Sequence, residues 1–176
     1  VNDAPILSAT ATSPTFTEDA SAQTLFSGAS VSVVEAGQAI KSLTFTVSGL
    51  QNGSAEQISV DGSLISLANG TGTTTTNGMT YTVSVVSGTA TIVLDKAAGV
   101  STANVASLIN SMTYQNTSQD PTAGNRVVTL TQIKDTGGVA NGGVDTTAVS
   151  IASTVAVNAV NDAPILSATA TSPTFT

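Results

Sequence analysis

The acidic side chains are the groups in this sequence with the greatest capacity for chemistry. The 176 residues include eleven Asp or Glu residues but only four Lys or Arg residues, and they include no His or Cys. Most of the acids stand at the ends of alternating runs, beside Gly, Pro or Asn, where turns are expected. Turns of a sandwich gather at two poles, where unpaired carboxylates repel one another unless a cation intervenes. Oxygen ligands without nitrogen or sulfur ligands favour Ca²⁺.

The composition excludes several classes of function. Without Cys and His the chain cannot build a structural zinc site, a haem or iron–sulfur ligand set, a disulfide framework or a Ser-His-Asp triad. A net charge of −7 repels phosphate backbones and anionic membrane surfaces, so we expect no nucleic-acid partner. No stretch approaches the ~20 continuous apolar residues of a membrane span, so we expect no membrane insertion.

Period-2 alternation of β-branched residues with Thr or Ser dominates the chain and predicts strands. Asp61-Gly62 separates two alternating runs of five residues, which is a strong signal for a two-residue hairpin. The repeated turn signals favour an all-β fold, an antiparallel β-sandwich. The polar segment 72–78, Gly-Thr-Thr-Thr-Thr-Asn-Gly, is expected to form a mobile loop.

One segment departs from the strand pattern and predicts a short helix near residues 102–112. Ser101 or Thr102 can serve as its N-cap. Packing over the end of the sandwich is the simpler explanation of its single apolar stripe, and an amphipathic helix that binds a partner is the alternative. The apolar residues recur at i, i+3, i+4 and i+7 and are Val105, Leu108, Ile109 and Met112.

The sequence contains a long internal repeat. Residues 1–17 recur without a change as residues 160–176, an offset of 159 residues. This period is too long for a solenoid and suits a whole domain, so we expect one complete unit at 1–159 and the first segment of the next tandem unit at 160–176. An artificial cloning scar is the alternative. The second segment lacks the rest of its domain, so we expect it to be mobile or to dock on a neighbouring molecule.

Motifs at the repeat boundary and late in the unit resemble a known family. Val-Asn-Asp-Ala-Pro-Ile closes one unit and opens the next, Phe-Thr-Glu-Asp (16–19) follows it, and Ser-Met-Thr-Tyr-Gln-Asn-Thr-Ser (111–118) precedes Pro-Thr-Ala-Gly-Asn-Arg-Val-Val-Thr-Leu-Thr (121–131). The chain thereby resembles the cadherin-like tandem repeats of giant bacterial RTX adhesins, exported by type I secretion and similar to chondroitin-sulfate-proteoglycan-type cadherin relatives. The resemblance implies a cadherin- or immunoglobulin-like Greek-key sandwich.

The resemblance also implies positions for calcium ligands. Glu18 resembles the glutamate that follows the first strand of cadherins, and Asp95 in Leu-Asp-Lys resembles the aspartate of their Leu-Asp-Arg-Glu motif. Residues 158–164, Asn-Ala-Val-Asn-Asp-Ala-Pro, are similar to a shortened cadherin linker. Asp135 in Lys-Asp-Thr-Gly-Gly resembles the late acidic loop.

This sequence also departs from the cadherin pattern. The second acid of Leu-Asp-Arg-Glu is missing, and Val-Glu35-Ala-Gly stands where cadherins carry Asp-x-Asp, which implies fewer or weaker ions. Asp61 and Asp145 are more simply interpreted as turn residues, and for Asp120 a plain loop is an equal alternative. The complete set of expected Ca²⁺ ligands is Asn2, Asp3, Glu18, Asp19, Glu35, Asp95, Asp120, Asp135, Asn161 and Asp162.

The favoured function is that of an extender repeat in an extracellular adhesin on a bacterial cell surface, which supports cell adhesion and biofilm formation. Calcium at the linkers would neutralise carboxylate repulsion and stiffen the array. The expected partners are neighbouring repeats of the same chain, and an isolated repeat is expected to be a monomer. An adhesive module that itself binds carbohydrate or a partner protein is the alternative. We do not expect an enzyme, because adjacent carboxylates such as Glu18-Asp19 point to opposite faces of an extended segment.

Overall fold

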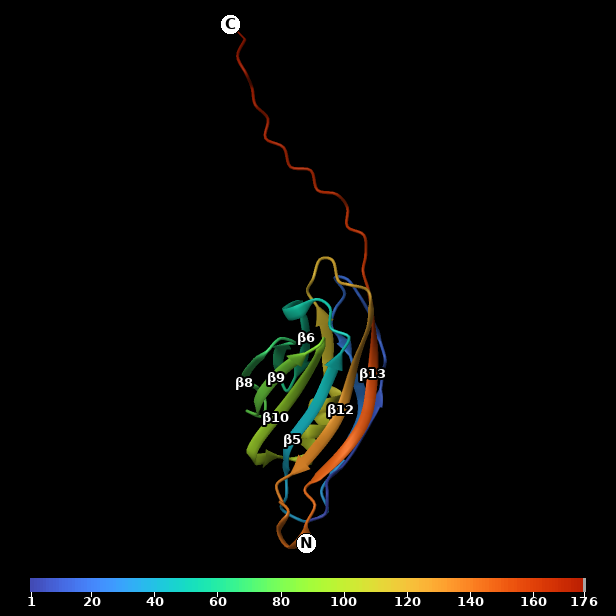
Figure 1. Ribbon diagram of the computed structural model, residues 1–176, viewed down its shortest axis with the longest axis vertical. Coiled ribbons are helices and arrows are strands. Elements are labelled where there is room, and N and C mark those ends of the chain that lie inside the picture. Colours follow the sequence, from blue (N-terminus) through green and yellow to red (C-terminus); the bar gives the residue numbers. More distant parts are fainter. Residues whose placement is uncertain (176) are drawn as a thin grey trace.

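The computed structural model describes residues 1–175, and strands dominate it (Figure 1). The strands are β1 (Ile6–Ala11), β2 (Thr15–Thr17), β3 (Gln23–Thr24), β4 (Phe26–Ser32), β5 (Ile40–Ser48), β6 (Glu56–Val60), β7 (Ser63–Ser66), β8 (Gly70–Thr73), β9 (Thr80–Val86), β10 (Thr89–Val100), β11 (Thr113–Asn116), β12 (Gly124–Asp135) and β13 (Thr146–Asn158). The helical segments are α1 (Thr102–Asn110) and two 3-10 turns, η1 (Gly53–Ala55) and η2 (Ala140–Gly142). The predicted all-β fold with one short helix is confirmed.

The strands form three sheets that pack as sandwich-like layers. The largest sheet has the order β2-β13-β12-β5-β10-β9-β8, a second has the order β3-β11-β6-β7, and β1 pairs with β4. The pairing is antiparallel except between β2 and β13, which run parallel. That parallel pair departs from the expected fully antiparallel sandwich. Its strand β2 belongs to an N-terminal segment that runs in the same direction as β13, the last strand.

The core is aliphatic with a few aromatic rings, as the alternation of apolar and hydroxyl residues predicts. Inward-facing residues of the large sheet, such as Phe45 and Leu130, are fully buried together with residues of the smaller sheets. Phe16 of β2 meets Tyr114 of β11 edge to face, with ring centroids 5.7 Å apart. This aromatic contact joins the two larger sheets, because β2 and β11 belong to different ones.

The predicted hairpin at Asp61-Gly62 is confirmed. β6 pairs with β7 in antiparallel register, and Val60 lies opposite Ser63. Asp61 has a φ of 51° and Gly62 a φ of 75°, the left-handed conformations that a tight two-residue hairpin requires. Gly accepts this conformation without strain, and Asp is among the few other residues that tolerate it.

The predicted helix is confirmed with a slightly earlier end. α1 spans Thr102–Asn110, and the Ser101 hydroxyl accepts a hydrogen bond from the Asn104 amide at 3.2 Å, which makes Ser101 the N-cap. Three of the predicted stripe residues on α1 are buried, and Met112 is buried just beyond its end. The helix contacts β4, so its apolar stripe belongs to the core.

Segment 72–78 differs from the expected mobile loop. Its first two residues complete β8, which pairs with β9. Thr74 is buried, its amide donates to the Met79 carbonyl at 2.8 Å, and its hydroxyl donates to Asp61. The carboxylate of Asp61 therefore ties this turn to the β6–β7 hairpin, a long-range contact that the local sequence does not reveal.

Residues 159–175 follow β13 and extend away from the domain at the end opposite to the N-terminus (Figure 1). Ile165, Leu166 and Phe175 are each exposed by 92% or more. The division of the chain at residue 159 stays a prediction. Among the described residues, no helix is long and apolar enough to span a membrane.

Candidate functional site

Most of the predicted calcium ligands lie at two opposite poles of the domain, which β13 connects. Just before β13 begins, the Val144 amide donates to the Asn2 carbonyl at 2.8 Å, and where β13 ends, the Asn158 carbonyl accepts from the Glu18 amide at 3.0 Å. Thirteen residues of extended strand span about 40 Å at ~3.3 Å per residue. We define the N-terminal pole as Asn2, Asp3, Glu35, Gln38 and Asp135, and the C-terminal pole as Glu18, Asp19, Asp120 and residues 159–162.

Glu18 is the central residue of the C-terminal pole. It follows β2 directly, and its side chain is buried beside the segment that leaves β13. Its Oε2 accepts a hydrogen bond from the Val160 amide at 2.8 Å. Its Oε1 is buried and has no hydrogen-bond partner within the described chain. One carboxylate oxygen thus holds the segment after β13, and the other is free to accept a cation.

The remaining acids of the C-terminal pole are exposed. Asp19 accepts a hydrogen bond from the Gln119 side chain at 3.1 Å, which brings the neighbouring Asp120 to the same pole. Asn161 and Asp162 lie one and two positions beyond Val160, the partner of Glu18, and the Asn161 side-chain amide donates to the Asp162 carbonyl at 3.1 Å. The structure therefore gathers the predicted linker and the Glu18-Asp19 pair at one end.

Asn2 and Asp135 form the buried part of the N-terminal pole. The Asn2 side-chain amide donates to Asp135 Oδ1 at 3.0 Å and to the Val144 carbonyl at 2.8 Å. The Gly137 amide also donates to Asp135 Oδ1, at 2.8 Å. Asp135 Oδ2 is buried and has no hydrogen-bond partner within the described chain. A β-carbon on Gly137 would lie 2.2 Å from Asn2 Oδ1, so only Gly leaves room for this arrangement.

Glu35 and Gln38 complete the N-terminal pole. The Asp3 amide donates to Glu35 Oε1 at 3.0 Å, and the Gln38 side-chain amide donates to Asn2 Oδ1 at 2.7 Å. Glu35 Oε2 and Gln38 Oε1 are buried atoms without a hydrogen-bond partner in the described chain. Sequence reasoning missed Gln38, because only acids and linker amides were considered as ligands. Its position three residues after Glu35 in the same turn was the available signal.

Asp95 does not join Glu18. It lies on β10 opposite Ser42 of β5, and Ser42 in turn lies opposite Lys134, one residue before Asp135. Asp95 is therefore on the half of the sheet toward the N-terminal pole, and its role as a calcium ligand stays a prediction.

The unpartnered oxygens test whether the poles suit a metal ion. Carboxylate and amide oxygens are the ligands that Ca²⁺ prefers. A buried oxygen that accepts no hydrogen bond is costly unless a cation or a water molecule satisfies it, so these atoms fit Ca²⁺. No group of three His, Cys, Asp or Glu residues within residues 1–175 is close enough to hold a metal ion. The unpartnered oxygens are Glu18 Oε1, Glu35 Oε2, Gln38 Oε1 and Asp135 Oδ2.

Asp61 and Asp145 have the structural roles that their sequence contexts favoured. Asp61 accepts from Thr74 and from the Asn77 side chain at 2.5 Å. Asp145 accepts from the Thr146 hydroxyl at 2.8 Å and pairs with Lys134 at 3.0 Å. The hydrogen bond from Thr146, and next the Lys134 ammonium, lower the pKa of Asp145 below its usual value.

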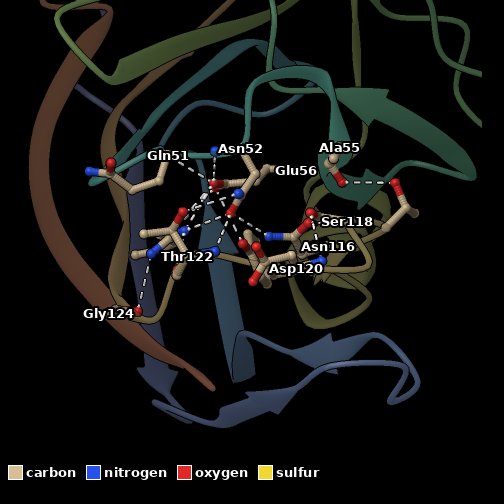
Figure 2. Close-up of polar contacts among 12 residues, drawn as sticks. Gln51, Asn52, Ala55, Glu56, Asn116, Ser118, Asp120, Thr122 and Gly124 are labelled. Atoms are coloured by element: carbon tan, nitrogen blue, oxygen red, sulfur yellow. Dashed lines mark hydrogen bonds and ion pairs between the residues drawn. The ribbon is translucent and has the colours of Figure 1, made fainter. Parts of the chain in front are cut away.

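A buried ion pair beneath the C-terminal pole was missed by sequence reasoning (Figure 2). The Arg126 guanidinium contacts Glu56 Oε1 at 3.1 Å, and both side chains are at most 1% exposed. Arg126 also donates to Asn52 Oδ1 at 3.1 Å and to the Thr122 carbonyl at 2.9 Å. Glu56 Oε1 accepts from the amides of Gln51 and Asn52, so the pair anchors two loops at this end of the sandwich.

Tyr114 links this ion pair to Phe16. Its hydroxyl donates to Glu56 Oε2 at 3.3 Å, while its ring contacts Phe16, two residues before Glu18. Burial of the phenol, and next the negative charge of Glu56, raise the pKa of Tyr114. Buried contacts therefore connect Phe16, close to Glu18 in the chain, through Tyr114 to the ion pair.

Comparisons with protein-family models, with curated proteins and with solved structures found no match to this chain.

Proposed function

We propose that this chain is a calcium-stabilised extender repeat of an extracellular adhesin on a bacterial cell surface, in which Ca²⁺ at the linkers between repeats stiffens a stalk that supports cell adhesion and biofilm formation. The proposal combines the resemblance of the linker and late motifs with the placement of the oxygen ligands. The buried oxygens without a hydrogen-bond partner all lie at the two poles, so we restrict the proposed ligands to residues of the poles.

The observation that carries the proposal is the relation between the poles. Asn161 and Asp162 leave the C-terminal pole next to Glu18, which has an unpartnered oxygen. Their counterparts one period earlier, Asn2 and Asp3, lie among the unpartnered oxygens of the N-terminal pole. In a tandem array, the linker therefore carries ligands from the C-terminal pole of one repeat into the N-terminal pole of the next.

A site shared between two repeats would explain why neither pole, within residues 1–175, brings three acids close enough to hold a metal ion by itself. Two consecutive repeats would supply the oxygen ligands together. They would come from Glu18 of one repeat, from the linker, and from Glu35 and Asp135 of the next repeat. Ca²⁺ bound there would neutralise the facing carboxylates and restrict the hinge after Asn158. Because the ligands come from distant segments, binding would also add to the free energy of folding.

The test uses a tandem protein in which residues 1–159 are followed by residues 1–176. In millimolar Ca²⁺ its maximum dimension, measured by small-angle X-ray scattering, should increase relative to EDTA, and its melting temperature should rise. Free Ca²⁺ at about 100 times the dissociation constant of one site adds ~2.7 kcal/mol to the free energy of unfolding. The 176-residue chain is the control and should respond less, because it lacks a second complete repeat. Equal maximum dimension and melting temperature in Ca²⁺ and EDTA would contradict the proposal.

The adhesive alternative has weaker support. Carbohydrate sites use exposed aromatic rings as flat platforms, but four of the aromatic side chains here are buried: Phe16, Phe26, Phe45 and Tyr114. Binding of a single repeat to a glycan array would favour that alternative.

A further inference from the structure

Two copies of one segment have opposite environments in this chain. Leu7 is 8% exposed and Phe16 is 1% exposed, whereas their counterparts Leu166 and Phe175 are 92% and 100% exposed. The segments are identical in sequence, so the difference arises only from what each can reach. The second copy therefore exposes apolar side chains whose counterparts in the first copy are buried in this fold.

The first copy shows where this segment docks in the fold. β1 pairs antiparallel with β4, with Leu7 opposite Val31, and β2 pairs in parallel with β13, with Phe16 opposite Val157. The Phe16 ring is buried against Tyr114. The docking site is therefore the β4 edge, the β13 edge and the ring of Tyr114.

The second copy cannot reach this site in its own domain. Asn161 would have to take the place of Asn2, at the start of β13, but it follows Asn158, at the end of β13, by only three residues. Three residues reach about 10 Å, whereas β13 spans about 40 Å. Figure 1 shows the segment continuing away from the pole at which β13 ends.

We infer that, in the 176-residue protein, residues 160–175 form a donor strand pair that docks on the β4 and β13 edges of a second molecule, in the place that residues 1–16 hold. In a tandem array the same segment would fill this place in the following repeat. This inference does not depend on calcium. Because the donor leaves one pole and the docking site begins at the other, the contact is head-to-tail and does not close on itself, so it generates open chains rather than closed dimers.

In the unchanged protein, each molecule's own residues 1–16 compete with the incoming donor. Residues 1–16 and the incoming residues 160–175 make the same contacts. However, residues 1–16 belong to the same molecule as the docking site, so their effective concentration there is in the millimolar range. Exchange is therefore expected only near millimolar protein. A substitution in residues 1–16 that weakens their docking, with residues 160–175 left intact, shifts the balance toward exchange.

The test is the substitution Phe16→Ala in the full chain. It removes a buried ring from the first copy and leaves Phe175 intact, which should tighten self-association roughly 100- to 1,000-fold, into the micromolar range. Analytical ultracentrifugation at tens of micromolar should then show a concentration-dependent series of oligomers. Phe175→Ala should be monomeric. Phe16→Ala combined with Phe175→Ala should also be monomeric, because both copies are equally weakened.

The double variant separates strand exchange from aggregation of a damaged core, since both proteins lack the Phe16 ring. Monomeric Phe16→Ala at 100 μM, or equal association of the single and double variants, would overturn the inference. If circular dichroism shows that Phe16→Ala does not fold, the milder variants Leu7→Ala and Leu166→Ala replace the Phe variants, and their self-association is judged in the same way.

Disulfide trapping tests the register of the docked segment. Ser30 lies opposite Ser8, the counterpart of Ser167, so Ser30→Cys with Ser167→Cys should give a disulfide-linked ladder in the exchanging variant.

Discussion

Arg126 and Glu56 form a buried ion pair at 3.1 Å that joins β12 of the large sheet to β6 of the smaller one. The guanidinium also holds Asn52 and the Thr122 carbonyl, so its charge and its donors are satisfied from several elements. The free-energy cost of removing both charges from water is offset only while the partners remain together.

Breaking this pair should destabilise the domain more than replacing it. Glu56→Gln leaves a buried guanidinium without its counter-ion and is expected to lower the free energy of unfolding by about 3–5 kcal/mol, measured by urea denaturation. Glu56→Met combined with Arg126→Met should cost less than Glu56→Gln alone. A double variant that is less stable than the single variant would show that the loop anchoring, not the unpaired charge, is decisive.

Tyr114 should govern the stability of the domain at alkaline pH. Burial and the charge of Glu56 raise the pKa of Tyr114 above its unfolded value of 10.0, so folding favours the protonated phenol. This stability is fully present below about pH 10 and is lost as the pH rises further. Tyr114→Phe should reduce the alkaline loss in urea denaturation, whereas Tyr81→Phe should retain it. An unchanged alkaline profile in Tyr114→Phe would contradict this expectation.

Asp145 should contribute to stability at neutral pH and lose that contribution in acid. The hydrogen bond from Thr146 and the Lys134 ammonium lower the pKa of Asp145 below 3.8. Its stabilising effect is therefore present above about pH 4 and is lost as the pH falls through the folded-state pKa. Lys134 is partly exposed, so Asp145→Asn should cost only about 0.5 kcal/mol at pH 7. The difference between variant and wild type should vanish near pH 2, as measured by thermal unfolding.

Glu18 and Asp95 should respond differently to calcium in the tandem protein. Glu18→Gln changes an unpartnered carboxylate oxygen beside the linker and should abolish most of the Ca²⁺-dependent rise in melting temperature. Asp95 lies in the β10–β5 ladder and has no buried unpartnered oxygen, so Asp95→Asn should leave that rise largely intact. Calorimetric titration of both variants measures the contrast. A larger loss from Asp95→Asn would favour the ligand set of cadherins over the placement seen here.

The elements that depend on neighbouring residues were predictable from sequence. The Asp61-Gly62 hairpin and the helix capped by Ser101 arise from local backbone preferences and from short periods of apolar residues. The polar identity of both poles was also predictable, because turn residues collect where strands end. The extent of the helix differed by two residues, within the usual fraying of helix ends.

The partners of individual charges could not be predicted in the same way. Glu56 shares the inward face of its strand with Ile58, and Arg126 shares that of its strand with Val128, so two inward charges of opposite sign were a signal. That signal could not establish their contact, because it depends on how two sheets stack.

The sequence by itself determined the strand-rich fold, the absence of His and Cys as candidate metal ligands, and the identity of two segments 159 residues apart. Only the tertiary structure decided that Glu18 meets the linker while Asp95 lies toward the other pole. It also decided that one copy of the segment is buried and the other exposed. The reason is physical: local preferences act between near neighbours in the chain, whereas strand register and sheet stacking bring together residues more than a hundred positions apart.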